Sequence, residues 1–132
     1  MENISKKIVD IACEALYDKK AENILVLDIQ GMTVIADYFI LCDGRSNLQV
    51  QALSDALEDA LDAQGIHFLR TEGYDQGRWV VLDYGDVLIH IFQKDEREFY
   101  NLERLWKRGD NASEYPPRDA QETQPAQPTQ AE

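Results

Sequence analysis

The chain has 132 residues, of which 44% are hydrophobic, and its formal net charge is −12. That length supports one domain with a core, and the hydrophobic content excludes a wholly disordered chain. Binding to nucleic acid needs clustered Lys and Arg, so this negative charge excludes a broad phosphate-binding surface. The charge is explained either by a basic partner or by simple solubility. No apolar run approaches the ~20 residues that span a membrane, and no secretory signal is apparent, so we expect a cytoplasmic protein without membrane contact.

The cysteines and histidines do not favour a metal site. Cys13 and Cys42 form no CxxC pair, and the only histidines are His67 and His90. We therefore expect buried, reduced thiols and neither a metal ion nor another cofactor.

Helices and strands alternate along the first part of the chain, as the spacing of apolar residues indicates. Ser46 or Asn47 is expected to cap the second helix, and Gly65 to end it. The predicted elements are a helix from Ile4 to about Asp18, strands over 23–29 and 37–42, a helix to about Gln64, and a strand over 66–72.

Residues 78–92 predict a β-hairpin with a tight turn at Tyr84-Gly85, in which Leu82 lies opposite Val87 and Trp79 opposite His90. Side chains alternate along a strand, so the hairpin has two faces. One face is purely aliphatic and is expected in the core: Val80, Leu82, Val87, Ile89 and Ile91. The other carries Trp79, Val81, Leu88, His90 and Phe92. A face this apolar is covered by another layer of the chain or holds a partner.

After the hairpin, Asp95 is expected to cap a last helix that carries Phe99, Leu102, Leu105 and Trp106. All four prolines follow this helix, in a segment rich in Gln, Thr and Ala. We therefore predict a domain over residues 1–108 and a disordered acidic tail over 109–132.

This order of elements predicts an α+β fold, with a mixed five-stranded sheet and helices packed mainly on one face. The other face of the sheet would then stay open, as the apolar second face of the hairpin suggests.

An enzymatic alternative depends on Gly44-Arg45-Ser46, which could cradle a phosphate at the start of a helix. A nucleotidyl or phosphoryl transferase would add paired carboxylates that hold magnesium. The pair here would be Asp83 and Asp86, but they flank a turn instead of alternating along a strand. His90 could be a general base, although its expected neighbour Trp79 is neither an acid nor a nucleophile. We favour a protein that is not an enzyme, with Trp79 at an interface.

The last helix has a mild positive bias, which allows at most a peripheral contact with RNA and is equally explained by a solvated helix face. Its basic residues are Lys94, Arg97, Arg104, Lys107 and Arg108.

Several sequence blocks resemble the Iojap or ribosomal silencing factor family. They are Lys19-Lys20-Ala21-Glu22 with Val26-Leu27-Asp28, Ala36-Asp37-Tyr38-Phe39-Ile40, Gly44-Arg45-Ser46 with Gln49-Val50, Glu72-Gly73 with Trp79, Asp83-Tyr84-Gly85-Asp86-Val87 with His90-Ile91-Phe92, and Arg97-Glu98-Phe99-Tyr100 with Leu102-Glu103 and Leu105-Trp106. The blocks follow one another over residues 5–106 and leave the tail outside the resemblance.

The resemblance implies a nucleotidyltransferase-like fold without the catalytic carboxylates. It also implies a cytoplasmic translational repressor that binds the large ribosomal subunit through its ribosomal protein fourteen. Such a factor blocks joining of the small subunit when nutrients are scarce, and family members are often homodimers when free.

The resemblance does not assign a surface to this partner. From the alternation along the hairpin, we expect an apolar centre that docks on the ribosomal protein, formed by Trp79, Val81, Leu88, His90 and Phe92. Three acids, Asp37, Asp83 and Asp86, would pair with basic groups around it. The same face could form a homodimer away from the ribosome.

Overall fold

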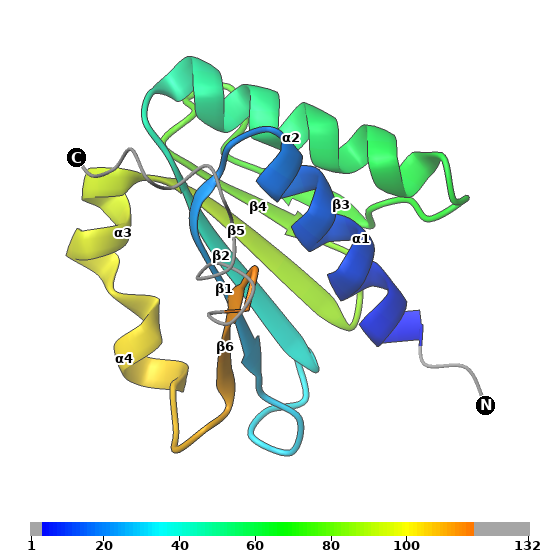
Figure 1. Ribbon diagram of the computed structural model, residues 1–132, viewed down its shortest axis with the longest axis vertical. Helices are drawn as coiled ribbons and strands as arrows, with labels where there is room; N and C mark the ends of the chain where they lie inside the picture. Colours follow the sequence, from blue (N-terminus) through cyan, green and yellow to red (C-terminus); the bar gives the residue numbers. More distant parts are fainter. Residues whose placement is uncertain (1–3, 118–132) are drawn as a thin grey trace.

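The computed structural model of the chain describes residues 4–117. In chain order, its elements are α1 (Ile4–Asp18), β1 (Glu22–Asp28), β2 (Tyr38–Gly44), α2 (Asn47–Asp62), β3 (Arg70–Glu72), β4 (Trp79–Asp83), β5 (Val87–Gln93), α3 (Lys94–Tyr100), α4 (Leu102–Trp106) and β6 (Ala112–Tyr115). The strands form one sheet in the order β3-β4-β5-β2-β1-β6 (Figure 1). Only β2 and β5 run parallel among these neighbours, so the predicted α+β class with a mixed sheet is confirmed.

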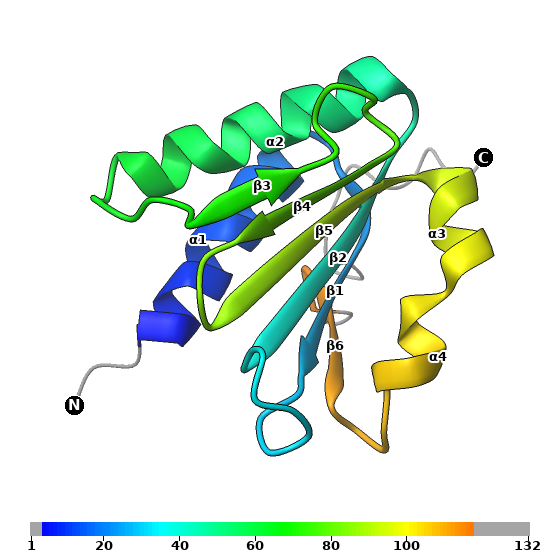
Figure 2. The same cartoon turned by 180° about the vertical axis from the view of Figure 1, so that it is seen from behind.

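Helices α1 and α2 form a layer on one face of the sheet, with α1 against β1, β2 and β5 and α2 against β2, β4 and β5 (Figures 1 and 2). The aliphatic face of the hairpin lies under this layer, with Val80, Leu82 and Ile89 fully buried, as the sequence predicts. Each large aliphatic side chain buried here stabilises the fold by roughly 1.5–3 kcal/mol. Cys13 and Cys42 lie in the same core as free thiols. Burial raises the pKa of the Cys13 thiol to about 12, which keeps it protonated and unreactive.

The hairpin turn lies one residue later than the sequence predicts. Tyr84 N donates to Val87 O over 3.0 Å, so Gly85 and Asp86 form the turn, and Gly85 takes the left-handed φ of +89°. Leu82 is therefore opposite Ile89, and Trp79 is opposite Phe92 instead of His90. The register moves by two residues, and an even shift leaves every side chain on its predicted face.

The last helix is broken in two, whereas the sequence predicts one helix capped by Asp95. Gln93 occupies the N-cap of α3, and Asn101 separates α3 from α4 with a left-handed φ of +47°. The break turns the chain so that Leu102 and Trp106 pack on the second face of the sheet, against Phe39 and Leu27. The sequence predicts that this face stays open, but α3 and α4 cover part of it (Figure 2).

The sheet has a sixth strand where the sequence predicts the start of the tail. Residues Ala112–Tyr115 pair antiparallel with β1, and Asp28 N donates to Asn111 O over 2.9 Å. The ordered fold thus passes the predicted boundary at residue 108, and residues 118–132 of the predicted tail lie outside the described residues. Among the helices of residues 4–117, none is both long and apolar enough to cross a membrane.

Candidate docking face

Three of the predicted site residues form one aromatic cluster on the second face of the sheet. Trp79 Nε1 donates to His90 Nδ1 over 3.1 Å, and the rings of Trp79 and Phe92 stack with their centroids 4.9 Å apart. Phe39 contacts His90 edge-on at 5.1 Å and meets Trp106 of α4 at the same centroid distance. The cluster therefore joins β4, β5, β2 and α4.

Burial differs along this face. Phe92 is fully buried and His90 is 7% exposed, so the expectation of exposed side chains is wrong at these two positions. Val81, Leu88 and Trp79 stay partly exposed, because α3 and α4 do not fully cover β4 and β5 on this face. The accessible part lies over β4 and β5, with His90 and Phe92 beneath Trp79 as its support.

The aromatic cluster extends outward along α3. The ring of Tyr100 lies 4.7 Å from Trp79, and Phe99 contacts Tyr100 edge-on at 5.0 Å. Tyr100 is 46% exposed and Phe99 is 80% exposed. The apolar spacing of the last helix predicts Phe99 on its apolar side and does not single out Tyr100. Adjacent residues point in different directions from a helix, so the pair Phe99-Tyr100 in the sequence indicates that at least one aromatic ring lies away from the core.

His90 is a neutral packing residue in this geometry. Burial lowers the pKa of its imidazole to about 4, and its Nδ1 accepts the indole N–H. Its Nε2 is buried without a hydrogen-bond partner among the described residues. The contacts given for the ring within residues 4–117 are with Trp79, Phe39 and Phe92, and none of these is an acid or a nucleophile, so the arrangement does not favour a general base.

The three predicted acids do not share one environment. Asp83 is opposite Leu88 in the sheet, and its Oδ1 accepts from Gly85 N over 2.8 Å. Asp37 precedes β2, and its backbone N donates to Asp86 O over 2.7 Å. The carboxylate of Asp86 accepts from Ser5 Oγ of α1 over 3.3 Å, so Asp86 faces the other layer of the protein.

The transferase alternative gains no support from the Gly44-Arg45-Ser46 loop. Ser46 Oγ caps α2 by accepting from Gln49 N, and Gln49 Oε1 accepts from Arg45 N over 2.7 Å. A Cβ at Gly44 would come within 2.8 Å of Val50 Cγ2, so close packing of α2 explains the glycine. Asp83 and Asp86 point to different sides of the turn. In residues 4–117, no group of three His, Cys, Asp or Glu side chains is placed to hold a metal ion.

Arg97, one of the basic residues of the last helix, is buried instead of solvated. Its guanidinium donates to Asp43 Oδ1 over 2.8 Å, to the carbonyl of Asn23 over 2.6 Å, and to Glu103 Oε2 over 3.1 Å. Burial opposes the charge of Arg97, but the hydrogen bonds to both carboxylates raise its pKa above the ordinary value. This ion pair fixes α3 to the sheet, so Arg97 is not available to RNA.

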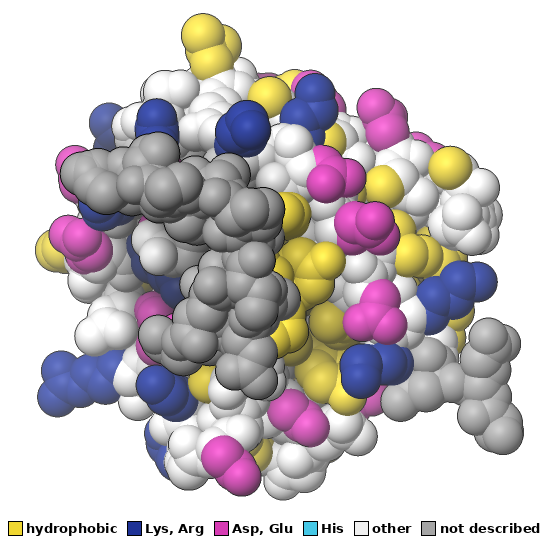
Figure 3. Space-filling model, viewed as in Figure 1, with side chains coloured by type: hydrophobic (Ala, Val, Ile, Leu, Met, Phe, Trp, Pro, Cys, Tyr) yellow, Lys and Arg dark blue, Asp and Glu magenta, His cyan; other side chains and the backbone are white. Residues whose placement is uncertain are grey.

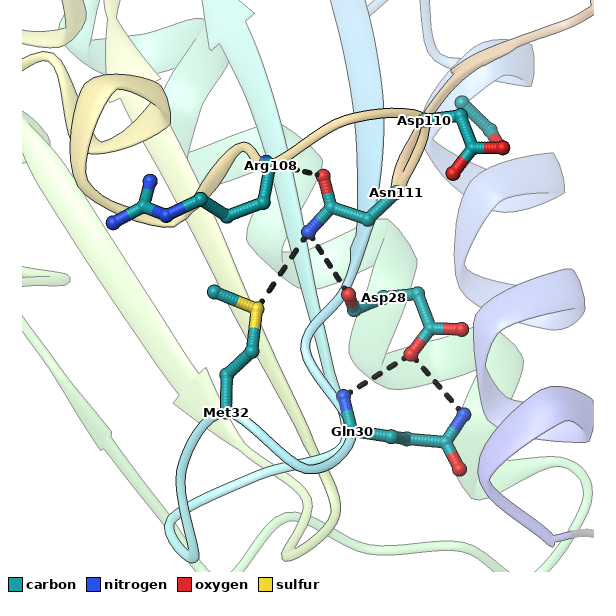
Figure 4. A pocket seen from close by; sticks show the side chains of 7 residues that line it. Asp28, Gln30, Met32, Arg108, Asp110 and Asn111 are labelled. Atoms are coloured by element: carbon teal, nitrogen blue, oxygen red, sulfur yellow. Dashed lines mark hydrogen bonds between the residues drawn. The ribbon is translucent and has the colours of Figure 1, made fainter.

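A shallow polar pocket lies where the chain after α4 meets the end of β1 (Figure 4). Asn111 Nδ2 donates to the carbonyls of Asp28 and Trp106, both over 3.0 Å, and its Oδ1 accepts from Arg108 N. These bonds use the amide group of Asn111 within the protein. Its structural effect is to hold the end of α4, and hence Trp106, beside the sheet.

The chain is similar to known proteins over most of its length. The sequence profile of the family described as "Ribosomal silencing factor during starvation" matches residues 2–132. The Ribosomal silencing factor RsfS of Bacillus subtilis is 50% identical over 101 residues, which are 76% of this chain and 86% of that protein. The chloroplastic protein Iojap of Zea mays is 34% identical over 95 residues, which are 70% of this chain and 40% of that protein.

The fold is also found in a solved structure. A crystal structure of a Chromobacterium violaceum protein superimposes with a TM-score of 0.77 at 34% sequence identity, and the match covers 83% of this chain and 90% of that one. Profile, relatives and structure agree with the order of the sequence blocks described above, and the chain belongs to the ribosomal silencing factor family.

Proposed function

We propose that this protein represses translation by docking on the large ribosomal subunit through ribosomal protein fourteen of that subunit, where it occupies space that the small subunit needs. Family membership supports a role in ribosome silencing. The choice of partner comes from the resemblance of the sequence blocks, and the steric mechanism follows from placing a folded domain at the subunit interface.

The docking face we propose is centred on Trp79, Val81 and Leu88, with Tyr100 and Phe99 as its extension on α3. The observation that carries this assignment is the incomplete cover of the face. Val81 and Leu88 remain partly exposed beside a stacked aromatic cluster, and aromatic side chains at such positions often dominate binding energy. His90 and Phe92 support Trp79 from below.

Acidic groups border the face and suit a basic protein partner. Asp83 is opposite Leu88, and Glu72 is opposite Val81 on β3. Asp83 also lies 3.9 Å from Arg70 Nε, an exposed surface pair that a basic partner would have to replace. Asp37 joins them in the proposal, whereas Asp86 is assigned to holding α1 through Ser5. Rim charges of this kind speed the encounter with a partner of opposite sign, and salt weakens the effect. A homodimer through the same face would compete with the ribosome.

The test is co-sedimentation of the purified protein with separated large and small ribosomal subunits, at low and at moderate salt. We expect the protein to migrate with the large subunit alone, and less completely at higher salt. Val81→Lys places a cation at the centre of the face without removing a core side chain, and we expect it to weaken binding by about 2 kcal/mol or more.

Leu48→Lys is the matched control, because Leu48 is 78% exposed on α2, in the opposite layer. It introduces the same charge and should leave co-sedimentation unchanged. Trp79→Ala is a poorer probe, because it also removes the stacking on Phe92 and the bond to His90. Full binding by a folded Val81→Lys variant would disprove the site. Absence of binding to any subunit would disprove the partner.

A further inference from the structure

A second half-exposed apolar area lies on the opposite side of the sheet, beside α1. Helix α1 packs against β1 and β2 and buries Ile24, whereas Val26, Tyr38 and Tyr115 stay partly exposed at the margin of this layer. Val26 is opposite Ile40 and Ser113, and Tyr115 is opposite Ile24, so these side chains alternate toward α1. Figure 3 shows an apolar band in this region.

Tyrosines dominate this area. Tyr38 and Tyr115 are half-buried, and Tyr17 at the end of α1 is 39% exposed and contacts Tyr115 edge-on at 5.9 Å. Gln30 Nε2 donates to the Tyr38 hydroxyl oxygen over 3.1 Å and also to Asp28 Oδ1, which places Asp28 at the same end of the area. Tyrosine supplies a large amphipathic contact area at low conformational cost and is frequent at protein interfaces.

A row of carboxylates borders the tyrosines along α1. Asp10, Glu14 and Asp18 follow one another at intervals of four residues, so they share one side of the helix, and all three are exposed. Figure 3 shows acidic side chains beside the apolar band. The edge-on contact between Tyr17 and Tyr115 places the end of α1 beside that ring. Burial raises the pKa of Tyr115, and so do electrostatic interactions with Cys13, Glu14, Asp18 and Asp10. Lys6 and Lys7 precede the row, and Lys6 lies on the same side of the helix because it comes four residues before Asp10. Lys19 and Lys20 follow the row.

We propose that this tyrosine face, formed by Tyr17, Val26, Tyr38 and Tyr115 and bordered by Asp10, Glu14, Asp18 and Asp28, binds a basic polypeptide segment. The aliphatic carbons of its Lys or Arg side chains lie on the tyrosines, and their cations meet the carboxylates. Arg suits the face especially well, because a guanidinium both stacks on an aromatic ring and pairs with a carboxylate.

Charge argues against the other occupants of this face. Residues 118–132 contain one Arg and three acids, so their net charge is −2, and they contain no Val, Leu, Ile, Met, Phe, Tyr or Trp. A second copy of the chain would bring the same acidic row against the first, and RNA would be repelled. The face lies on the side of the sheet opposite Trp79, so it can be occupied while that side is bound, and it does not depend on the proposed function.

The test uses a short synthetic peptide of alternating Arg and Leu, titrated into the isotope-labelled full-length protein and followed by NMR. Peptides of alternating Glu and Leu, and of alternating Arg and Gly, separate the contributions of charge and of apolar contact. The indole N–H signals of Trp79 and Trp106 report on the opposite side of the sheet. We expect shifts at residues 10–18, 26–28, 38 and 113–115, with both indole signals unmoved.

The decisive variant is Asp10→Lys with Glu14→Lys, because both side chains are exposed on α1 and contribute no core packing. We expect its affinity for the Arg-Leu peptide to fall about tenfold or more. Asp59→Lys with Asp75→Lys changes the net charge equally at exposed positions away from the face. We expect this control to bind within about twofold of the unaltered chain, since distant exposed charges are largely screened.

Equal loss of affinity in both double variants would mean that only net charge matters, and it would overturn the proposal. Shifts centred on the indole signals, or no binding at all, would do the same. Two further measurements test the other occupants. Movement of the same signals on deletion of residues 118–132, without peptide, would assign the face to that segment. Movement with protein concentration would assign it to a second copy.

Discussion

Single residues on the docking face combine packing with a defined protonation state. His90 accepts the Trp79 N–H through Nδ1, so the face is assembled only with a neutral imidazole. The sequence predicts that both residues lie on one strand face, and the structure confirms it, but the depth of His90 depends on Phe39 and α4, which come from distant parts of the chain. Alternation within a hairpin carries no information about a third element above it.

Acid should destabilise the protein through His90. Its folded-state pKa is lowered to about 4 from an ordinary value of 6.5, because burial disfavours the charged imidazole. Protonation therefore favours the unfolded chain. At neutral pH the imidazole is neutral in both states, so its burial carries no protonation penalty. The free energy of unfolding falls as the pH drops from about 6.5 to about 4, by roughly 3 kcal/mol in total.

Urea unfolding at a series of pH values measures this effect. In His90→Asn, the amide oxygen can accept the Trp79 N–H in place of Nδ1, and the amide does not titrate. We therefore expect this variant to lose less stability than the unaltered protein between about pH 6.5 and about pH 4. His67→Asn is the control, because His67 is exposed and pairs only with Asp62 at the surface. A pH profile of His90→Asn that matches the unaltered protein would show that another group is responsible.

At the scale of elements, the sequence predicts most of what periodicity and capping determine. Both long helices, the hairpin faces and the Ser46 cap are confirmed. The break at Asn101 and the strand β6 were missed. The residues of β6, Ala112–Tyr115, have few large apolar side chains, and they form a strand because β1 offers an open edge. Such a partner is invisible in a local window of sequence.

The break between α3 and α4 depends on the backbone freedom of Asn101. Its φ of +47° lies in the left-handed region, which Asn and Gly tolerate and β-branched residues do not. We expect Asn101→Ile to destabilise the protein by about 1–2 kcal/mol. It should also increase exposure of the Trp106 ring, because α4 would no longer turn back onto Phe39.

Chemical denaturation and quenching of tryptophan fluorescence measure these two effects. Asn101→Gly is the matched control, since it removes the same side chain but keeps access to the left-handed region. We expect it to stay within about 0.5 kcal/mol of the unaltered protein. If both substitutions destabilise equally, the Asn101 side chain is responsible and the backbone argument fails.

At the scale of the whole molecule, the sheet is the element that separates two surfaces of different kinds. One side offers the Trp79 cluster and the other offers the tyrosine face, and both are bordered by acids. The net charge of −12 is consistent with partners that are basic proteins. The prediction of a single docking face came from the hairpin alone. The second face is formed by α1, β1, β2 and β6 together, and these elements come from both ends of the domain, so no short segment of the sequence indicates it.

The sixth strand decides where the folded molecule ends. A chain that stops at Arg108, the predicted boundary, loses β6 and the bonds of Asn111 to Asp28 and Trp106. It leaves the seven residues of β1 as an open edge, and edges of this kind pair with other chains. We expect it to lose about 2–4 kcal/mol of stability. It should also self-associate in sedimentation velocity.

A chain that stops at Pro117 keeps every strand the structure describes, and we expect it to remain as stable as the full chain. Equal stability of the two truncated chains would place the boundary at residue 108 after all, because β6 would then contribute nothing that the rest of the sheet requires.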